Sequence, residues 1–194
     1  MTLVDRIERA ALEQFTETGI RRASVDDIAR RAGVARVTVY RHVGGKDALL
    51  ALVLSGETRR AMTELDSVVA GARSPSEALE RSFSFLVRFV REHPLFDTLL
   101  RREPEVLLPP LTIDGQAFLD LYRSLAGERL AAMQRNGEID PPNLDWAAEA
   151  IARMAMSLVL TPSALVDSDD PDAVAAFARE MLLPLLRPQP ALVP

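Results

Sequence analysis

The clearest pattern of apolar and polar positions lies at residues 24–46, where it has the period of two short helices. The first helix shows the i, i+3, i+4, i+7 spacing of one apolar face, at Val25, Ile28, Ala29 and Ala32. Ser24 precedes this face as an N-cap residue, and Gly33 follows it as the residue type that ends a helix at a sharp turn. The pattern therefore predicts a helix followed by a tight turn.

A second short helix is predicted directly after that turn. Val39 and Val43 stand four positions apart and give it an inner apolar face. Its outer face carries side chains that have no buried role: Arg36, Val37, Thr38, Tyr40, Arg41 and His42. A helix of this size fits the major groove of DNA, and the turn fixes the angle at which it is presented.

Helices are also predicted on both sides of this pair. Upstream, one apolar face repeats at Val4, Ile7, Ala11 and Phe15, and Gly19 supplies the stop. Downstream, a fourth helix begins near Lys46, the only lysine in the chain. The N-terminus of a helix offers unpaired amides and partial positive charge, so this start suits a phosphate group.

With Tyr40 and Lys46 in these places, residues 24–46 resemble the DNA-binding motif of the tetracycline-repressor (TetR) family of bacterial transcription regulators. The resemblance covers about the first 60 residues well and the remainder only in architecture. The chain departs from the family pattern at Ala35, Val43 and the pair Gly44-Gly45, without a threat to the fold. The resemblance implies a DNA-binding set of eight residues: Ser24, Arg36, Val37, Thr38, Tyr40, Arg41, His42 and Lys46.

Within this set, the family roles divide into base reading and phosphate contact. Arg36 and Val37 would face base edges, where Arg pairs with guanine and Val touches a thymine methyl group. Four residues would hold phosphates without reading sequence: Thr38, Tyr40, His42 and Lys46. Arg41 could do either.

Composition narrows the class of protein. The formal net charge of −5 divides into +3 for residues 1–60 and −8 for residues 61–194, so a basic head is followed by an acidic body. The chain has no cysteine and only two histidines, His42 and His93, which argues against a metal site, a cofactor and thiol chemistry. With no Gly-rich phosphate loop or signal peptide and no long apolar run, we expect a cytoplasmic protein that is not an enzyme.

Beyond residue 60 the pattern is helical almost throughout. Helices are predicted from Ser74-Pro75, from Pro94, over residues 115–135, over 146–160 and over 172–186, while the prolines from Pro104 to Pro110 break the pattern. We therefore predict an all-α protein with a helix-turn-helix domain at residues 2–60 (motif 24–43). A larger helical ligand-binding and dimerisation domain is predicted at 61–186, followed by a loose tail at 187–194.

Aromatic residues gather on the helices that follow residue 80. Core packing explains any one of them, but as a set they could enclose an apolar cavity for a small molecule. The candidate pocket residues are Phe83, Leu86, Phe89, Phe96, Leu100, Phe118, Tyr122 and Met154. The resemblance favours this reading, since such regulators usually sense a ligand in the C-terminal domain.

The last two predicted helices are apolar over most of their circumference. Such helices must be buried on two sides, and two in succession suggest a subunit interface in the form of a four-helix bundle. The candidate interface residues are Ala155, Leu158, Val159, Phe177, Met181 and Leu185.

These features together predict a homodimeric regulator, most simply a repressor that leaves a palindromic operator in double-stranded DNA when a small, mainly apolar effector binds. The alternative is a ligand-independent DNA-binding or DNA-organising protein with a solid helical core. No membrane association is expected.

Overall fold

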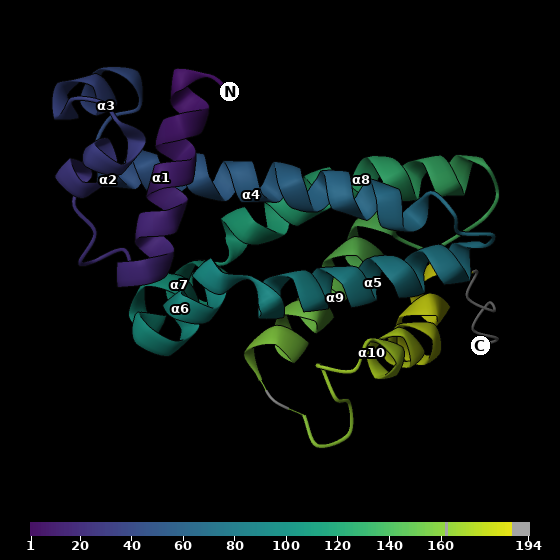
Figure 1. The fold of residues 1–194 in the computed structure, drawn as a ribbon. Helices are drawn as coiled ribbons and strands as arrows, with labels where there is room; N and C mark the ends of the chain where they lie inside the picture. Colours follow the sequence, from purple (N-terminus) through teal and green to yellow (C-terminus); the bar gives the residue numbers. More distant parts are fainter. Residues whose placement is uncertain (162, 188–194) are drawn as a thin grey trace. The chain divides into compact units, whose positions relative to one another are not determined.

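The computed structural model describes residues 1–161 and 163–187. Over these residues the chain consists of helices joined by loops, and none of them lies in a β-strand (Figure 1). The all-α fold is therefore confirmed, whereas the predicted tail lies outside the described residues from position 188 onward. No helix in the described part of the chain is long and apolar enough to cross a membrane.

The chain divides into two compact units. The first combines Met1–Glu64 with Glu92–Leu108, and the second combines Leu65–Arg91 with the described residues from Pro109 onward. The sequence predicts a single boundary at residue 60. The structure instead assigns residues 92–108 to the first unit, so neither unit is one continuous segment.

Four short helices and the start of a long one build the first unit. They are α1 (Leu3–Thr18), α2 (Val25–Ala32), α3 (Arg36–His42), α6 (Pro94–Arg102) and the first part of α4 (Lys46–Val69), and α7 (Pro104–Leu111) begins in it. The fully buried side chains include Ile7, Phe15, Ile28, Val39 and Leu95. One core therefore joins the helix-turn-helix to a helix that lies more than fifty residues later in the sequence.

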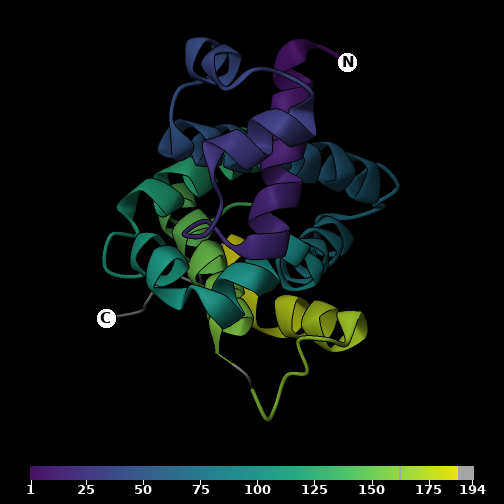
Figure 2. The same ribbon diagram turned by 60° about the vertical axis from the view of Figure 1, so that its left-hand side comes forward.

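Polar contacts reinforce this packing at the C-terminal end of α1, beside which α6 lies (Figures 1 and 2). The Thr98 hydroxyl donates to the Thr16 carbonyl oxygen at 2.9 Å. The Glu103 side chain, in a residue only 6% exposed, accepts from the backbone amides of Ile20 at 2.8 Å and Arg21 at 3.1 Å. These bonds satisfy backbone donors in the α1–α2 connection, which has no helical partners of its own.

Gly19 is required where this connection begins. Its φ of +80° is a conformation that side-chain-bearing residues rarely adopt, and an added Cβ would lie 2.4 Å from a Glu103 carboxylate oxygen. The glycine that the sequence assigned to ending a helix therefore also makes room for Glu103.

The prolines after residue 103 behave differently from the prediction. Pro104 begins the separate helix α7 instead of only breaking the previous one, and Pro109 and Pro110 lie inside α7. A proline fits the first turn of a helix because the amide that it lacks would have no partner there. The sequence prediction missed this helix.

The second unit contains α5 (Pro75–Glu92), α8 (Gln116–Arg135), α9 (Leu144–Leu160) and α10 (Pro171–Phe177). A π-helical segment, η1 (Ala178–Leu182), and a 3-10 turn, η2 (Leu183–Leu186), follow α10. The predicted helix at 172–186 is thus present in three hydrogen-bonding forms. Pro184 lacks the amide that a continuing α-helix would need.

Glu103→Ala should destabilise the first unit by about 1 to 3 kcal/mol, because the buried amide of Ile20 and the part-buried amide of Arg21 lose their acceptor. Amide hydrogen exchange of the full chain should show faster exchange at Ile20 and Arg21. Glu105→Ala is the matched control, since it removes only an exposed ion pair with Arg21 and should cost no more than about 1 kcal/mol. Equal protection at Ile20 and Arg21 in both variants would contradict this role of Glu103.

Candidate DNA-binding site

Helix α2 begins at Ser24 as the sequence predicts. The Ser24 hydroxyl oxygen accepts from the Asp27 amide at 3.1 Å, and the hydroxyl donates to the Asp27 carboxylate. This second hydrogen bond lowers the pKa of Asp27. The predicted N-cap is therefore present, and the place of the half-buried Ser24 among the DNA-binding residues stays a prediction.

The turn between the two helices depends on Gly33. Its φ of +68° and ψ of +38° are left-handed, and its amide donates to carbonyl oxygens in the last turn of α2. The Val34 amide donates to the Ala29 carbonyl oxygen at 3.0 Å, which completes the turn. The chain therefore changes direction over the three residues Gly33, Val34 and Ala35 and starts α3 at Arg36.

Helix α3 separates its two faces sharply. Val39 is fully buried, whereas Val37 is 71% and Tyr40 44% exposed. Arg36, Arg41 and His42 are also exposed, and Thr38 is half-buried. Of the six predicted DNA-binding residues on α3, all but the half-buried Thr38 are thus exposed.

The exposed Arg36 side chain is in contact with two other side chains. Its Nη1 lies 2.9 Å from Asp26 Oδ2, and its Nη2 donates to the Tyr40 hydroxyl at 3.3 Å. The guanidinium carbon also lies 5.3 Å from the centre of the Tyr40 ring, within the range of a cation–π contact. The hydrogen bond to Tyr40 and the charge of Asp26 raise the pKa of Arg36.

Lys46 at the start of α4 also has partners within the chain. Its ammonium donates to the carbonyl oxygens of Arg21 at 3.1 Å and Ala23 at 3.5 Å. An ammonium has three N–H donors, so one remains for a phosphate. Lys46 therefore ties α4 to the α1–α2 connection, a structural role that no local sequence signal indicated.

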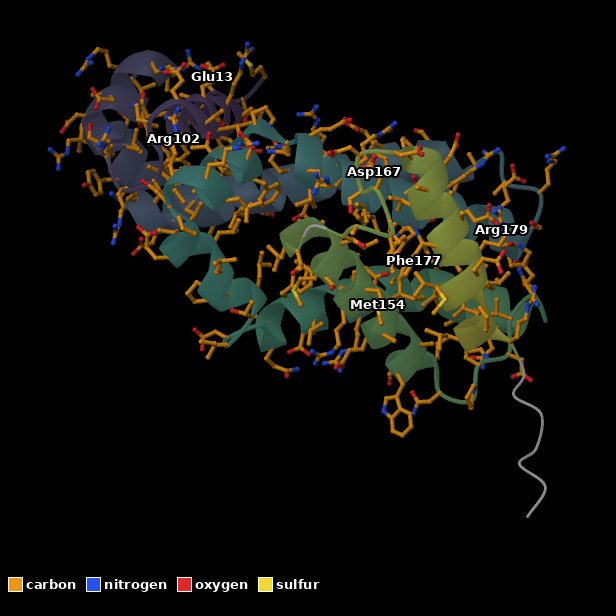
Figure 3. The ribbon with its side chains drawn as sticks, turned by 90° about the horizontal axis from the view of Figure 1, so that it is seen from below. Glu13, Arg102, Met154, Asp167, Phe177 and Arg179 are labelled. Carbon is orange, nitrogen blue, oxygen red and sulfur yellow. The ribbon has the colours of Figure 1, made fainter. Side chains whose placement is uncertain are left out.

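The candidate pocket residues are divided between the two units. Phe96 and Leu100 belong to α6 in the first unit, and the other six belong to the second. Phe83 is 1% exposed and stacks on Phe177 with ring centres 6.1 Å apart, so it is a core residue. Met154 lies on α9 (Figure 3). Its exposed fraction is 45%. The half-buried members in the second unit are Leu86, Phe89, Phe118 and Tyr122, and Phe96 and Leu100 of the first unit are half-buried as well.

The candidate interface residues lie mostly against the core of the second unit. Leu158 is buried, and four others are partly buried and pack on the same cluster: Ala155, Val159, Phe177 and Leu185. Only Met181, 60% exposed, presents a large apolar surface. The core of the second unit therefore covers Leu158 fully and the other four in part, and the interface stays a prediction.

Two family profiles match the chain. "Bacterial regulatory proteins, tetR family" matches residues 7–53, and "Bacterial Tetracyclin repressor, C-terminal domain" matches residues 75–181. An HTH-type transcriptional regulator of Mycobacterium tuberculosis is 28% identical over 187 residues, which cover 96% of this chain and 87% of the relative.

Solved structures share the fold at lower identity. The TetR family repressor AlkX from Dietzia sp. strain DQ12-45-1b, implicated in biodegradation of n-alkanes, is 21% identical, with a TM-score of 0.66 over 93% of each chain. RolR in complex with resorcinol is 18% identical, with a TM-score of 0.65 over 98% of this chain and 96% of that one. Because the two profiles together cover the helix-turn-helix and most of the rest of the sequence, the chain belongs to the TetR family of bacterial transcription regulators.

Proposed function

We propose that this DNA-binding regulator is a repressor that a small, mainly apolar effector releases from a palindromic operator. The observation that carries the proposal is the outer face of α3, where basic and aromatic side chains project while Val39 anchors the helix in the core. Members of the family are transcription regulators and not enzymes.

On this face, Arg36 would read a guanine and the exposed Val37 would contact a thymine methyl group. Arg41 would contact phosphate, because it is exposed and no ion pair joins it to another residue in the described part of the chain. The amides at the start of α4, with the remaining Lys46 donor, would hold a second phosphate. Phosphate contacts fix the register on DNA, while base contacts select the sequence.

The effector would bind in the second unit, against the half-buried members of the candidate pocket set. Among these side chains, Tyr122 carries the polar group, a hydroxyl. Its ring packs against the core, burial raises its pKa, and no hydrogen bond reaches its hydroxyl from residues 1–161 or 163–187. Because a half-buried hydroxyl without a protein partner can bond to a ligand, we expect an apolar effector with one hydrogen-bonding group.

The active form would be a dimer, as for regulators of this family. Trp146 and Met154 stand eight positions apart on α9, hence on one helix face, and both are exposed, as is Met181 on η1. Exposed large apolar side chains on neighbouring segments suit burial by a second copy. We therefore revise the interface to these three residues. A two-fold dimer would present two copies of α3 to half-sites about 34 Å apart.

Replacing Arg36 with Ala should relax base preference at one position in each half-site. The expected cost is about 1 to 3 kcal/mol on the preferred sequence, because one bidentate contact is lost. Selection from a randomised duplex library, followed by fluorescence anisotropy on the recovered sequences, measures both quantities. An unchanged site preference would show that Arg36 does not read a base.

Lys46→Ala should weaken binding to every sequence by a similar factor, without a change of preference. The slope of log affinity against log salt should become shallower by about 0.9 if one phosphate contact is lost. The thermal midpoint must be recorded in parallel, because Lys46 also ties α4 to the α1–α2 connection. A steeper slope, or a changed preference, would contradict the phosphate role.

Tyr122→Phe should leave DNA binding intact and weaken an effector that carries a polar group by about two- to tenfold, the worth of one hydrogen bond. A thermal-shift screen with matched pairs that differ by one hydroxyl, such as decane with decanol and toluene with cresol, detects this. The wild type should prefer the hydroxyl member, and the variant should lose that preference. If the variant kept the full preference, Tyr122 would not contact the effector.

The double variant Met154→Glu, Met181→Glu should yield a folded monomer that binds a palindrome about 100-fold more weakly or worse, because the second half-site no longer adds to affinity. Analytical ultracentrifugation gives the mass in solution. Leu165→Glu is the control, since Leu165 is 95% exposed and lies outside the helices. If the double variant and the control sedimented alike as dimers, the interface would lie elsewhere.

A further inference from the structure

Asp26 stands out because it is an acidic residue in contact with the recognition helix of a DNA-binding protein. It belongs to α2, and its carboxylate lies 2.9 Å from Arg36 Nη1. The Asp26 and Arg36 side chains are 53% and 57% exposed, and exposed ion pairs contribute little to the free energy of unfolding. The contact therefore does little for folding, while it lies on the surface that would meet DNA.

We propose that Asp26 is a specificity-determining positioning residue, which holds Arg36 in the orientation that reads a base and keeps it from binding phosphates at random. The inference rests on the proposed base-reading role of Arg36.

Arg36 has enough N–H donors to keep its contacts within the chain and to bind a base at the same time. A guanidinium has five N–H groups, and Asp26 and Tyr40 take one from each terminal nitrogen. One N–H remains on each terminal nitrogen, and a guanine edge takes two. Asp26 can therefore hold Arg36 from α2 while the same guanidinium contacts a base.

The contacts with Asp26 and Tyr40 restrict the motion of the Arg36 side chain before the protein binds DNA. Arg36 is fixed by Asp26 on one side and by the Tyr40 hydroxyl and ring on another. A long side chain that is already ordered loses less rotamer entropy on binding. A guanidinium held in one orientation also matches the edge of one base better than the edges of the other bases. Positioning of this kind favours the correct sequence over others.

The charge of Asp26 acts in the same direction. Its carboxylate offsets the charge of Arg36 and repels phosphate groups, so it weakens binding to DNA of any sequence. The hydrogen bonds to a correct base remain. The ratio of specific to non-specific affinity therefore rises even though total attraction falls.

Asp26→Asn in the full chain tests the proposal, with a duplex selected from a randomised library by the wild type and a scrambled duplex of equal length. Affinity for the scrambled duplex should rise, and the specificity ratio should fall about threefold or more as Arg36 loses its support. The salt slope on the scrambled duplex should steepen by about 0.9, because Arg36 now neutralises a phosphate.

Asp47→Asn is the matched control, because it removes an exposed carboxylate from the first turn of α4 in the same unit. It should strengthen binding to both duplexes by one factor and leave the ratio unchanged. In an Arg36→Ala background, Asp26→Asn should no longer change the ratio.

A specificity ratio that responds equally to Asp26→Asn and Asp47→Asn would overturn the proposal, as would a full Asp26→Asn effect without Arg36. If Arg36→Ala alone leaves base preference intact, the failure lies with the proposed reading face and Asp26 has nothing to position. Circular dichroism melts of each variant establish that the fold is kept.

Discussion

The seven residues of α3 form about two helical turns, and a helix this short is not stable in water by itself. Its position depends on the burial of Val39, which is fully covered by the first-unit core, and on Gly33, whose left-handed backbone ends α2. No side-chain hydrogen bond caps α3 at Ala35, so the core contact carries more of its stability. The burial of Val39 and the turn at Gly33 together set the orientation of α3, and thereby the direction in which each of its exposed side chains points.

Residues 92–108 support the same region from far along the sequence. Glu103 and Thr98 bind backbone groups around the end of α1. His93 ties the start of α6 to α4, because its Nδ1 accepts from the Leu95 amide at 3.2 Å and its Nε2 lies 2.6 Å from a carboxylate oxygen of Glu57. The helix-turn-helix and residues 92–108 therefore belong to one compact unit, and a change in α6 would act on the backbone that leads into α2.

Charge in the first unit is organised by pairing more than by net excess. Arg31 binds the carboxylates of Glu13 and Glu17, and Arg36 binds Asp26. The charge of +3 belongs to residues 1–60 alone, since the whole first unit holds 13 basic and 13 acidic residues and has a net charge of zero. Its basic residues differ in whether an acidic partner holds them. The paired ones are fixed in direction, which suits reading a pattern, while an unpaired exposed cation suits the uniform phosphate backbone.

The sequence by itself determined the helix-turn-helix, because its signals are local: the cap at Ser24, the glycine at Gly33 and the spacing of apolar residues act within four or five positions. It also determined the all-α class. Only the tertiary structure decided that Glu103 meets the α1–α2 connection, that α6 joins the first unit, and that Leu158 faces the core. These contacts join residues up to 83 positions apart, and apolar periodicity shows that a face is buried without showing what covers it.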